Sequence, residues 1–270
     1  MSEAKLKRQT HASILANAVG CIYCAGNAPA TQIDHMPPRI IFRQNQRPKG
    51  LEFPSCANCN QGTSPLDVVA AYMTQSFPGI SNPKESAEWS KLFREVDRVA
   101  PGLHLEMHIP QKQLEIRLLS MGIFDPNVAA FRANGPILSA YMQAFAAKVG
   151  FALHYEFTNK LVPNGGRVQV RWFTSEEMAY AKVPISLYDS VGTPLAMRQG
   201  KLSSKGVFEY GAGTYENEPK INLYFAKFRA GFEVAAFVVD EACDKPFEEG
   251  ELATFSPGDL QSTPYDRIID

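Results

Sequence analysis

Four of the five cysteines in this chain of 270 residues fall into two pairs with the spacing of a metal-binding knuckle. Cys21 and Cys24 form the first pair and Cys56 and Cys59 the second, with 31 residues between the pairs. Two such pairs can hold four thiolates in a tetrahedron about 2.3 Å from one zinc ion. Disulfides are the alternative, but they need an oxidising compartment. The spacing therefore predicts a structural Zn²⁺ site, and Cys243 stands outside it without a neighbouring cysteine.

The segment between the pairs, and the residue after them, carry groups suited to catalysis. Asp34 and His35 lie between the pairs, and Asn60 directly follows the last cysteine. A carboxylate and an amide carbonyl are hard oxygen ligands that suit Mg²⁺ or Mn²⁺. A histidine can take a proton from water near neutral pH. The residues thus indicate a second, catalytic metal and a general base. The alternative is that Asp34 is a turn residue, His35 a buried histidine and Asn60 a helix cap.

The order and spacing of these residues resemble the HNH, or ββα-metal, endonucleases. The similarity is closest to the branch of that family whose zinc is held by four cysteines. It covers about residues 18–75, roughly a quarter of the chain. The matching positions, in order, are Cys21, Cys24, Asp34, His35, Pro38, Arg39, Cys56, Cys59 and Asn60.

The resemblance implies a role for each of these positions. Asp34 and Asn60 would hold a catalytic Mg²⁺ or Mn²⁺, and His35 would activate the attacking water. Arg39 would contact a phosphate oxygen, unless it is only a surface residue. The implied reaction is hydrolysis of DNA phosphodiester bonds, which leaves a 5′ phosphate and a 3′ hydroxyl. The implied setting, by analogy alone, is a prokaryotic or phage enzyme of restriction or anti-phage defence.

The chain departs from the family pattern at two places. The family places its middle Asn a few residues before the second cysteine pair, but residues 49–55 contain none, and Asn45 lies further back. Thr63 and Ser64 stand where many members have a histidine or an acid, with Asp67 one helical turn beyond. Two alternatives therefore stay open. One is a nuclease subunit that is active only with a protein partner, and the other is a non-catalytic zinc-ribbon module that binds nucleic acid.

Composition narrows the class of protein. Hydrophobic residues make up 45% of the chain and charged residues 20%, which indicates a globular protein. No apolar run reaches the roughly 18–20 residues that span a bilayer, and residues 1–17 lack the apolar core of a signal peptide. We therefore expect no membrane contact and a cytoplasmic location. The net charge is -1, but residues 1–60 carry +4. A basic N-terminal part favours a polyanionic partner, DNA or RNA.

Periodicity predicts an α+β protein. The resemblance implies an HNH endonuclease domain at residues 1–78, which leaves an α+β domain of unassigned family at residues 79–270. The boundary falls in the Pro- and Gly-containing stretch 77–83. Helices are expected at residues 9–19, 65–76, 84–99, 136–154 and 176–182. Strands are expected at residues 168–172, 206–215, 220–227 and 232–239. A β-hairpin is expected at residues 103–118 and a loosely attached tail from residue 250.

The second domain contains one further group of metal-ligating types. In the predicted hairpin His104, Glu106 and His108 share one strand face, and we interpret them as a solvated face rather than a metal site. Target recognition, partner docking and effector sensing are all compatible with this domain.

Overall fold

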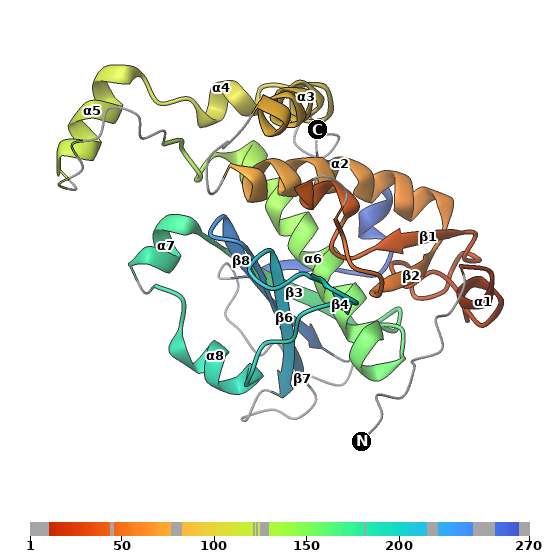
Figure 1. Ribbon diagram of the computed structural model, residues 1–270. Helices are drawn as coiled ribbons and strands as arrows, with labels where there is room; N and C mark the ends of the chain where they lie inside the picture. Colours follow the sequence, from red (N-terminus) through yellow and green to blue (C-terminus); the bar gives the residue numbers. More distant parts are fainter. Residues whose placement is uncertain are drawn as a thin grey trace.

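The computed structural model describes residues 11–43, 46–76, 83–120, 122, 124, 130–180, 182–214, 221–239 and 252–264. It is a mixed α and β structure with antiparallel sheets, as predicted. The long helix α6 (Pro136–Thr158) contacts both a five-stranded sheet and the helix α2 (Ala57–Gln75) (Figure 1). Within the described ranges no helix is long and apolar enough to cross a membrane.

The N-terminal part is a two-stranded hairpin followed by a helix. Strand β1 (Gln32–His35) pairs antiparallel with β2 (Glu52–Ser55), and α2 follows after Cys56. The short helix α1 (His11–Ala16) contacts both strands, and the 3-10 turn η1 (Arg39–Ile41) contacts α2. The strand–strand–helix order is the local arrangement that the sequence predicted for this part.

Helix α2 begins earlier than predicted. The sequence predicted a helix over residues 65–76, but the helix begins at Ala57, with Cys56 as its N-cap. The Cys56 sulfur accepts a hydrogen bond from the backbone N–H of Cys59 at 3.4 Å. Proline disfavours helix interiors because it has no N–H to donate, which made Pro65 look like a start. Residues on both sides of Pro65 are buried, so tertiary packing outweighs this local preference.

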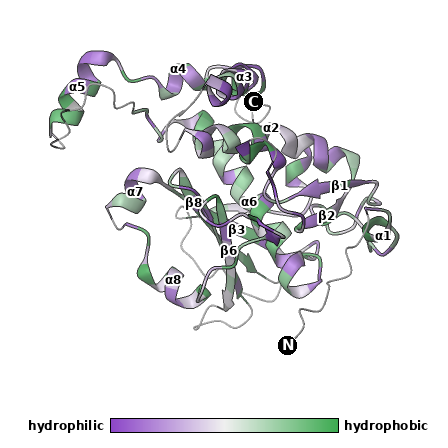
Figure 2. Cartoon of the chain, in the orientation of Figure 1, coloured by the Kyte–Doolittle hydropathy of each residue, from purple (hydrophilic) through white to green (hydrophobic). Residues whose placement is uncertain are grey.

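Helix α6 forms the centre of the molecule. It is apolar on nearly all sides, which is typical of a helix that is buried all round, and Figure 2 colours much of it as hydrophobic. A Cβ on Gly150 would lie 2.6 Å from Val168 and 2.8 Å from Ala236, so only glycine allows the helix to approach the sheet this closely. The predicted helix at residues 136–154 is confirmed and continues to Thr158.

The five-stranded sheet has the order β6-β7-β8-β3-β9. The expected strands are confirmed as β3 (Arg167–Thr174), β6 (Phe208–Thr214), β7 (Ile221–Phe228) and β8 (Phe232–Val239). The expected loose tail is wrong for residues 252–264. There β9 (Ala253–Phe255) pairs with β3, and η3 (Asp259–Gln261) packs on α2 with Leu260 buried. Phe255 and Leu260 are buried and hold this segment to the protein. The polar composition of the tail as a whole did not reveal these two apolar residues.

The predicted hairpin at residues 103–118 is wrong, because this stretch forms two helices. They are α4 (Leu103–Met107) and α5 (Gln111–Ser120). Leu103 and Met107 are buried four residues apart, while Leu105 is 82% exposed, so the apolar alternation did not mark one buried strand face. The side chain of Glu106 instead accepts hydrogen bonds from two backbone N–H groups at the start of α6, both at 2.8 Å.

The remaining helices and strands lie around α2, α6 and the five-stranded sheet. Helix α3 (Pro83–Val99) packs on α2 through Leu92 and Val96 and confirms the helix predicted there. The short helix predicted at residues 176–182 is α7 (Ser175–Ala179). Three further elements were not predicted: α8 (Ile185–Val191), β4 (Arg198–Gln199) and β5 (Leu202–Ser203).

One apolar core joins the two predicted domains. It includes Phe53 and Leu66 from the N-terminal part and Phe145, Phe151 and Phe228 from the rest. The division at residue 78 stays a prediction, and all but the last residue of its boundary stretch lie outside the described residues. Because this core is shared, the unit formed by β1, β2 and α2, which we call the hairpin unit, packs together with α6.

Gly62 allows a close approach between α2 and η3. A Cβ at this position would lie 2.2 Å from the carbonyl oxygen of Leu260. We expect Gly62→Ala to lower the free energy of unfolding by about 1–3 kcal/mol, because the backbone must shift. Urea unfolding measures this change. Gln61, the exposed neighbour of Gly62, provides the control, because Gln61→Ala should leave the free energy of unfolding unchanged. Equal stability of both variants would contradict the observed approach.

Candidate metal centre and active site

The four paired cysteines form a buried cluster that could hold a metal ion such as zinc. Their sulfur atoms all lie within 4.8 Å of one another, and none is in a disulfide. The first pair lies in a turn, in which the backbone N–H of Cys21 donates to the carbonyl of Ala28 at 3.1 Å. The second pair lies at the start of α2. Turn and helix start therefore bring the predicted ligands together.

The electrostatics of this cluster call for a cation. A hydrogen bond with Cys59 is the main cause that lowers the pKa of Cys21 to about 5. Burial, together with the charge of Cys21, raises the pKa of Cys24 to about 11. One thiolate therefore opposes the next, and four thiolates side by side require a positive ion between them. The chemistry of the donor set fits Zn²⁺.

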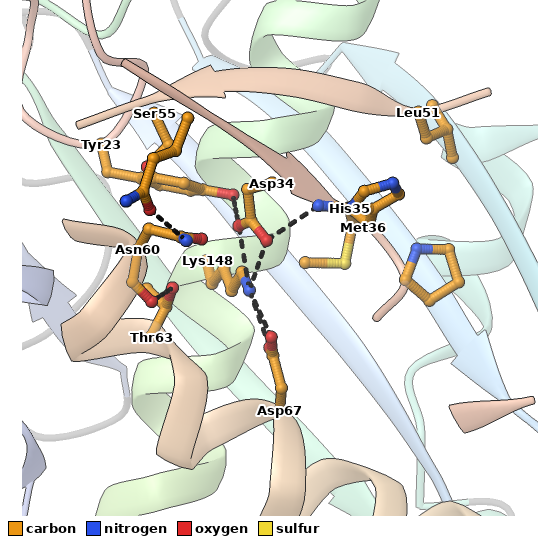
Figure 3. Close-up of polar contacts among 12 residues, drawn as sticks. Tyr23, Asp34, His35, Met36, Leu51, Ser55, Asn60, Thr63, Asp67 and Lys148 are labelled. Atoms are coloured by element: carbon orange, nitrogen blue, oxygen red, sulfur yellow. Dashed lines mark hydrogen bonds and ion pairs between the residues drawn. The ribbon is translucent and has the colours of Figure 1, made fainter. Parts of the chain in front are cut away.

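The carboxylate of Asp34 is buried and fully engaged (Figure 3). Its Oδ1 accepts from the backbone N–H of His35 at 2.8 Å and from Lys148 at 3.2 Å. Its Oδ2 accepts from the hydroxyl of Tyr23 at 2.6 Å and lies 2.9 Å from the Lys148 ammonium. Both oxygens of Asp34 therefore already have two protein contacts each.

Lys148 is a site residue that the sequence analysis missed. It comes from α6, its side chain is 0% exposed, and it also donates to Asp67 of α2 at 2.7 Å and 2.9 Å. Burial raises the pKa of Asp67 to about 7, whereas the two carboxylates raise the pKa of Lys148. The lysine therefore stays charged. The sequence did contain a sign of this role, a single lysine within an apolar helix. A charge buried in this way needs buried partners of opposite charge.

The side chain of Asn60 has a hydrogen-bond partner on strand β1. Its side-chain N–H donates to Oε1 of Gln32 at 2.5 Å, and its backbone carbonyl accepts from the hydroxyl of Thr63 at 3.3 Å. Its backbone N–H bonds to the carbonyl of Cys56 within the helix. The side chain is thus tied to the first strand of the hairpin.

A divalent ion on Asp34 and Asn60 does not fit this arrangement. Both oxygens of Asp34 are occupied, and a buried ammonium lies 2.9 Å from one of them. A second cation at this distance in a low-dielectric site would be repelled strongly. Asp34 and Asn60 therefore make no place for Mg²⁺ or Mn²⁺ while Lys148 holds this position.

His35 is only partly buried, at the rim of the same strand. Its Nε2 lies 2.8 Å from an Arg39 nitrogen, which can only donate, so Nε2 accepts. Burial, with the charges of Arg47 and Arg39, lowers the pKa of His35 to about 4. The ring is therefore neutral at neutral pH and carries a lone pair, as a proton acceptor must.

Two further side chains lie beside His35, and the sequence analysis missed both. Glu52 faces it across the hairpin, with Oε1 3.8 Å from Nε2 of His35. His11 of α1 places its Nε2 3.5 Å from Oε2 of Glu52, and its ring centroid lies 5.9 Å from that of His35. Glu52 lies within residues 49–55, where the family pattern has its middle Asn. Its place opposite His35 depends on the register of the two strands, which the sequence does not reveal.

The loop between the strands is held by Arg47. Its guanidinium donates to five backbone carbonyls at 2.7–3.2 Å, those of Met36, Pro37, Pro48, Gly50 and Leu51. Burial lowers its pKa to about 10, so the side chain remains charged. Arg47 thus braces the loop that presents Arg39, whereas Asn45, the weak substitute named from the sequence, lies outside the described residues.

The group on α4 also differs from its prediction. His104 stacks on Phe93 with ring centroids 3.6 Å apart, while Glu106 caps α6 and His108 is exposed. His104 and Glu106 thus have separate partners, and of the three side chains only His108 is exposed.

Comparison with known proteins identifies no relative: no family model, no curated protein and no solved structure matches the chain.

We expect the purified protein to contain one zinc ion per chain. Cys59→Ser should lose it, because three thiolates leave the tetrahedron incomplete. Metal analysis by mass spectrometry measures the zinc content, and circular dichroism reports whether the overall helix content is kept. Cys243→Ser is the matched control, since Cys243 lies outside the pairs and outside the described residues. Equal zinc content in both variants would contradict a four-cysteine site.

We expect Lys148→Met to cost about 3–5 kcal/mol of stability, because it leaves two buried carboxylates without their cation. Adding Asp34→Asn and Asp67→Asn should restore a large part of that loss, since no buried charge then remains. Urea unfolding measures the free energy of unfolding of the wild type, of Lys148→Met and of the triple variant. Lys160→Met, at an exposed position just after α6, should change nothing. A Lys148→Met protein as stable as the wild type would rule out the buried network.

Proposed function

We propose that the chain is an endonuclease of the HNH type that breaks phosphodiester bonds in nucleic acid. The observation that carries this proposal is the neutral imidazole of His35 beside the guanidinium of Arg39, 2.8 Å away, on the rim of a strand–strand–helix unit. A proton acceptor next to a phosphate-binding group is the minimum that phosphodiester cleavage requires. The resemblance in the sequence supports the same reading.

His35 acts as the general base in this proposal. Its Nε2 takes the proton of the attacking oxygen, and Arg39, which is exposed, turns from Nε2 to a phosphate oxygen. A guanidinium can bind a phosphate through two parallel hydrogen bonds and stabilises the negative charge that develops there. The zinc ion supports the backbone that presents these groups and takes no part in the chemistry.

The expected Mg²⁺ or Mn²⁺ on Asp34 and Asn60 is not part of this proposal. The oxygens of Asp34 are held by Lys148 and Tyr23, so no step is assigned to a metal at that place. DNA is the substrate that the resemblance implies, with RNA as the other polyanion of the same backbone chemistry. A role in restriction or anti-phage defence, inside the cell, rests on analogy with the family.

A second candidate is a module that does not cut alone, either a partner-activated subunit or a zinc ribbon that only binds nucleic acid. The buried pairing of Asp34 with Lys148 favours it, because the residue that the family uses for a catalytic metal is neutralised here. In a partner-activated subunit, a protein bound to the chain would have to change this pairing or supply the missing groups.

The test is cleavage of supercoiled plasmid and of single-stranded RNA by zinc-loaded protein, with Mg²⁺, with Mn²⁺ and with EDTA. We expect at least one substrate to be cut, and His35→Ala to be slower by about 10²-fold or more, as for loss of a general base. His108→Ala, at an exposed histidine away from the hairpin, is the matched control and should cut at the wild-type rate.

Two results would contradict the proposal. Equal cleavage by His35→Ala and wild type would place the activity elsewhere. Absence of cleavage by a folded, zinc-loaded protein would favour the second candidate, which pull-down of a partner from the native host then examines.

A further inference from the structure

Four side chains of acid–base and phosphate-binding types converge on the exposed rim of the hairpin. They are His11 from α1, His35 from β1, Glu52 from β2 and Arg39 from η1, and together we call them the rim cluster. Glu52 lies between the two imidazoles, 3.5 Å from His11 and 3.8 Å from His35. Arg39 contacts His35 at 2.8 Å. Four elements thus bring one carboxylate, two histidines and one guanidinium to one place.

The rim cluster is better suited to proton transfer than to a metal. The nitrogens of His11 and His35 and the carboxylate of Glu52 lie within 4.8 Å of one another, which is close enough for metal ligands. However, the lone pair of His35 already accepts from the Arg39 guanidinium. A cation at this position would have to displace one positive group and sit close to a second, Arg47.

We propose that the rim cluster cleaves single-stranded RNA without a divalent metal, using the 2′-hydroxyl of the substrate as nucleophile. This inference rests on the proposed function, in which His35 is the base of a nuclease, and it names the substrate class. It also follows from the closed site at Asp34: with Lys148 in the cation position, the activation of a water by a metal has no place there.

The reaction balances with the groups present. His35 takes the proton of the 2′-hydroxyl, the 2′ oxygen forms a bond to phosphorus, and the bond from phosphorus to the 5′ oxygen breaks. His11 gives its proton to the leaving 5′ oxygen. The products are a 2′,3′-cyclic phosphate and a 5′-hydroxyl end, and no water, metal or oxidant is consumed. Return of one proton from His35 to His11 through solvent resets the site.

The rim cluster supplies the groups that this reaction needs. The ring centroids of His11 and His35 are 5.9 Å apart, and the Glu52 carboxylate lies between their Nε2 atoms, so it has to turn aside when a phosphate enters between the two rings. Glu52 positions His11, because its Oε2 lies 3.5 Å from the Nε2 of that ring. Arg39 is exposed and free to turn to the phosphate oxygens.

DNA is a poorer substrate for these groups. An internal hydroxyl held next to the phosphate replaces an external water, and such intramolecular nucleophiles gain effective concentrations of about 10⁵–10⁸ M. DNA lacks this hydroxyl and would need a water that is activated more strongly than one imidazole can achieve. A single strand is preferred because its backbone can rotate to place the 2′ oxygen in line with the breaking bond.

The experiment compares three fluorescent oligonucleotides of one sequence: RNA, 2′-O-methyl RNA and DNA. Zinc-loaded full-length protein is tested in EDTA, with the zinc content checked afterwards, and then with Mg²⁺ or Mn²⁺. We expect only the RNA to be cut, at the same rate in EDTA, with 2′,3′-cyclic phosphate ends identified by mass spectrometry. His11→Ala should be slower by about 10²-fold or more, while His108→Ala cuts at the wild-type rate. Glu52→Gln should lower kcat with KM unchanged, as expected of a positioning residue.

The outcomes separate this inference from the proposed function. Cleavage of DNA or 2′-O-methyl RNA that needs Mg²⁺ or Mn²⁺ would overturn the inference and leave the proposed function standing. Full RNA cleavage by His11→Ala would also overturn the inference. If His35→Ala and His11→Ala both match the wild type, or if no oligonucleotide is cut, the inference and the proposed function fail together.

Discussion

The ammonium group of Lys148 is enclosed by protein and lies within 3.2 Å of oxygens from Asp34 and Asp67. Removing such charges from water is costly unless each is paired and hydrogen-bonded, so β1, α2 and α6 must keep one relative arrangement. The lysine comes from the second half of the chain, yet it occupies the centre of the N-terminal unit. The hairpin unit is therefore completed by α6 in both its apolar core and its buried charges.

The position of His35 follows from the burial of its neighbour. Successive residues of a strand point to opposite faces, so an inward Asp34 leaves His35 at the rim. The register of the hairpin then sets Glu52 opposite His35, and the contact of α1 with both strands brings His11 to the same edge. The four cysteines and the carbonyl contacts of Arg47 hold the two ends of this unit. The ion pairs of Lys148 lie inside the protein, and the rim cluster lies at the edge of the hairpin.

A lysine between two carboxylates has different chemistry from a metal ion in the same place. It carries one charge rather than two, it has no open coordination position, and it cannot lower the pKa of a bound water as a metal does. The negative charge of Asp34 is neutralised by Lys148, a residue of the chain itself. The imidazole, carboxylate and guanidinium groups of the rim cluster are of types that can transfer protons and bind phosphate. Both proposals for this chain rest on the presence of a lysine, rather than a metal ion, beside Asp34.

Local patterns in the sequence determined much of this protein. The two CxxC spacings predicted a four-cysteine cluster, and apolar periodicity predicted α3, α6 and the main strands, because these signals repeat within a few residues. They failed at residues 103–118, where a helix and a strand fit the same apolar positions, and at Pro65, where packing outweighs propensity. Tertiary structure alone decided the partners of Asp34 and the rim cluster. Lys148 lies 114 residues from Asp34, and no local pattern encodes a contact over that separation, because it depends on how α6 packs against the hairpin.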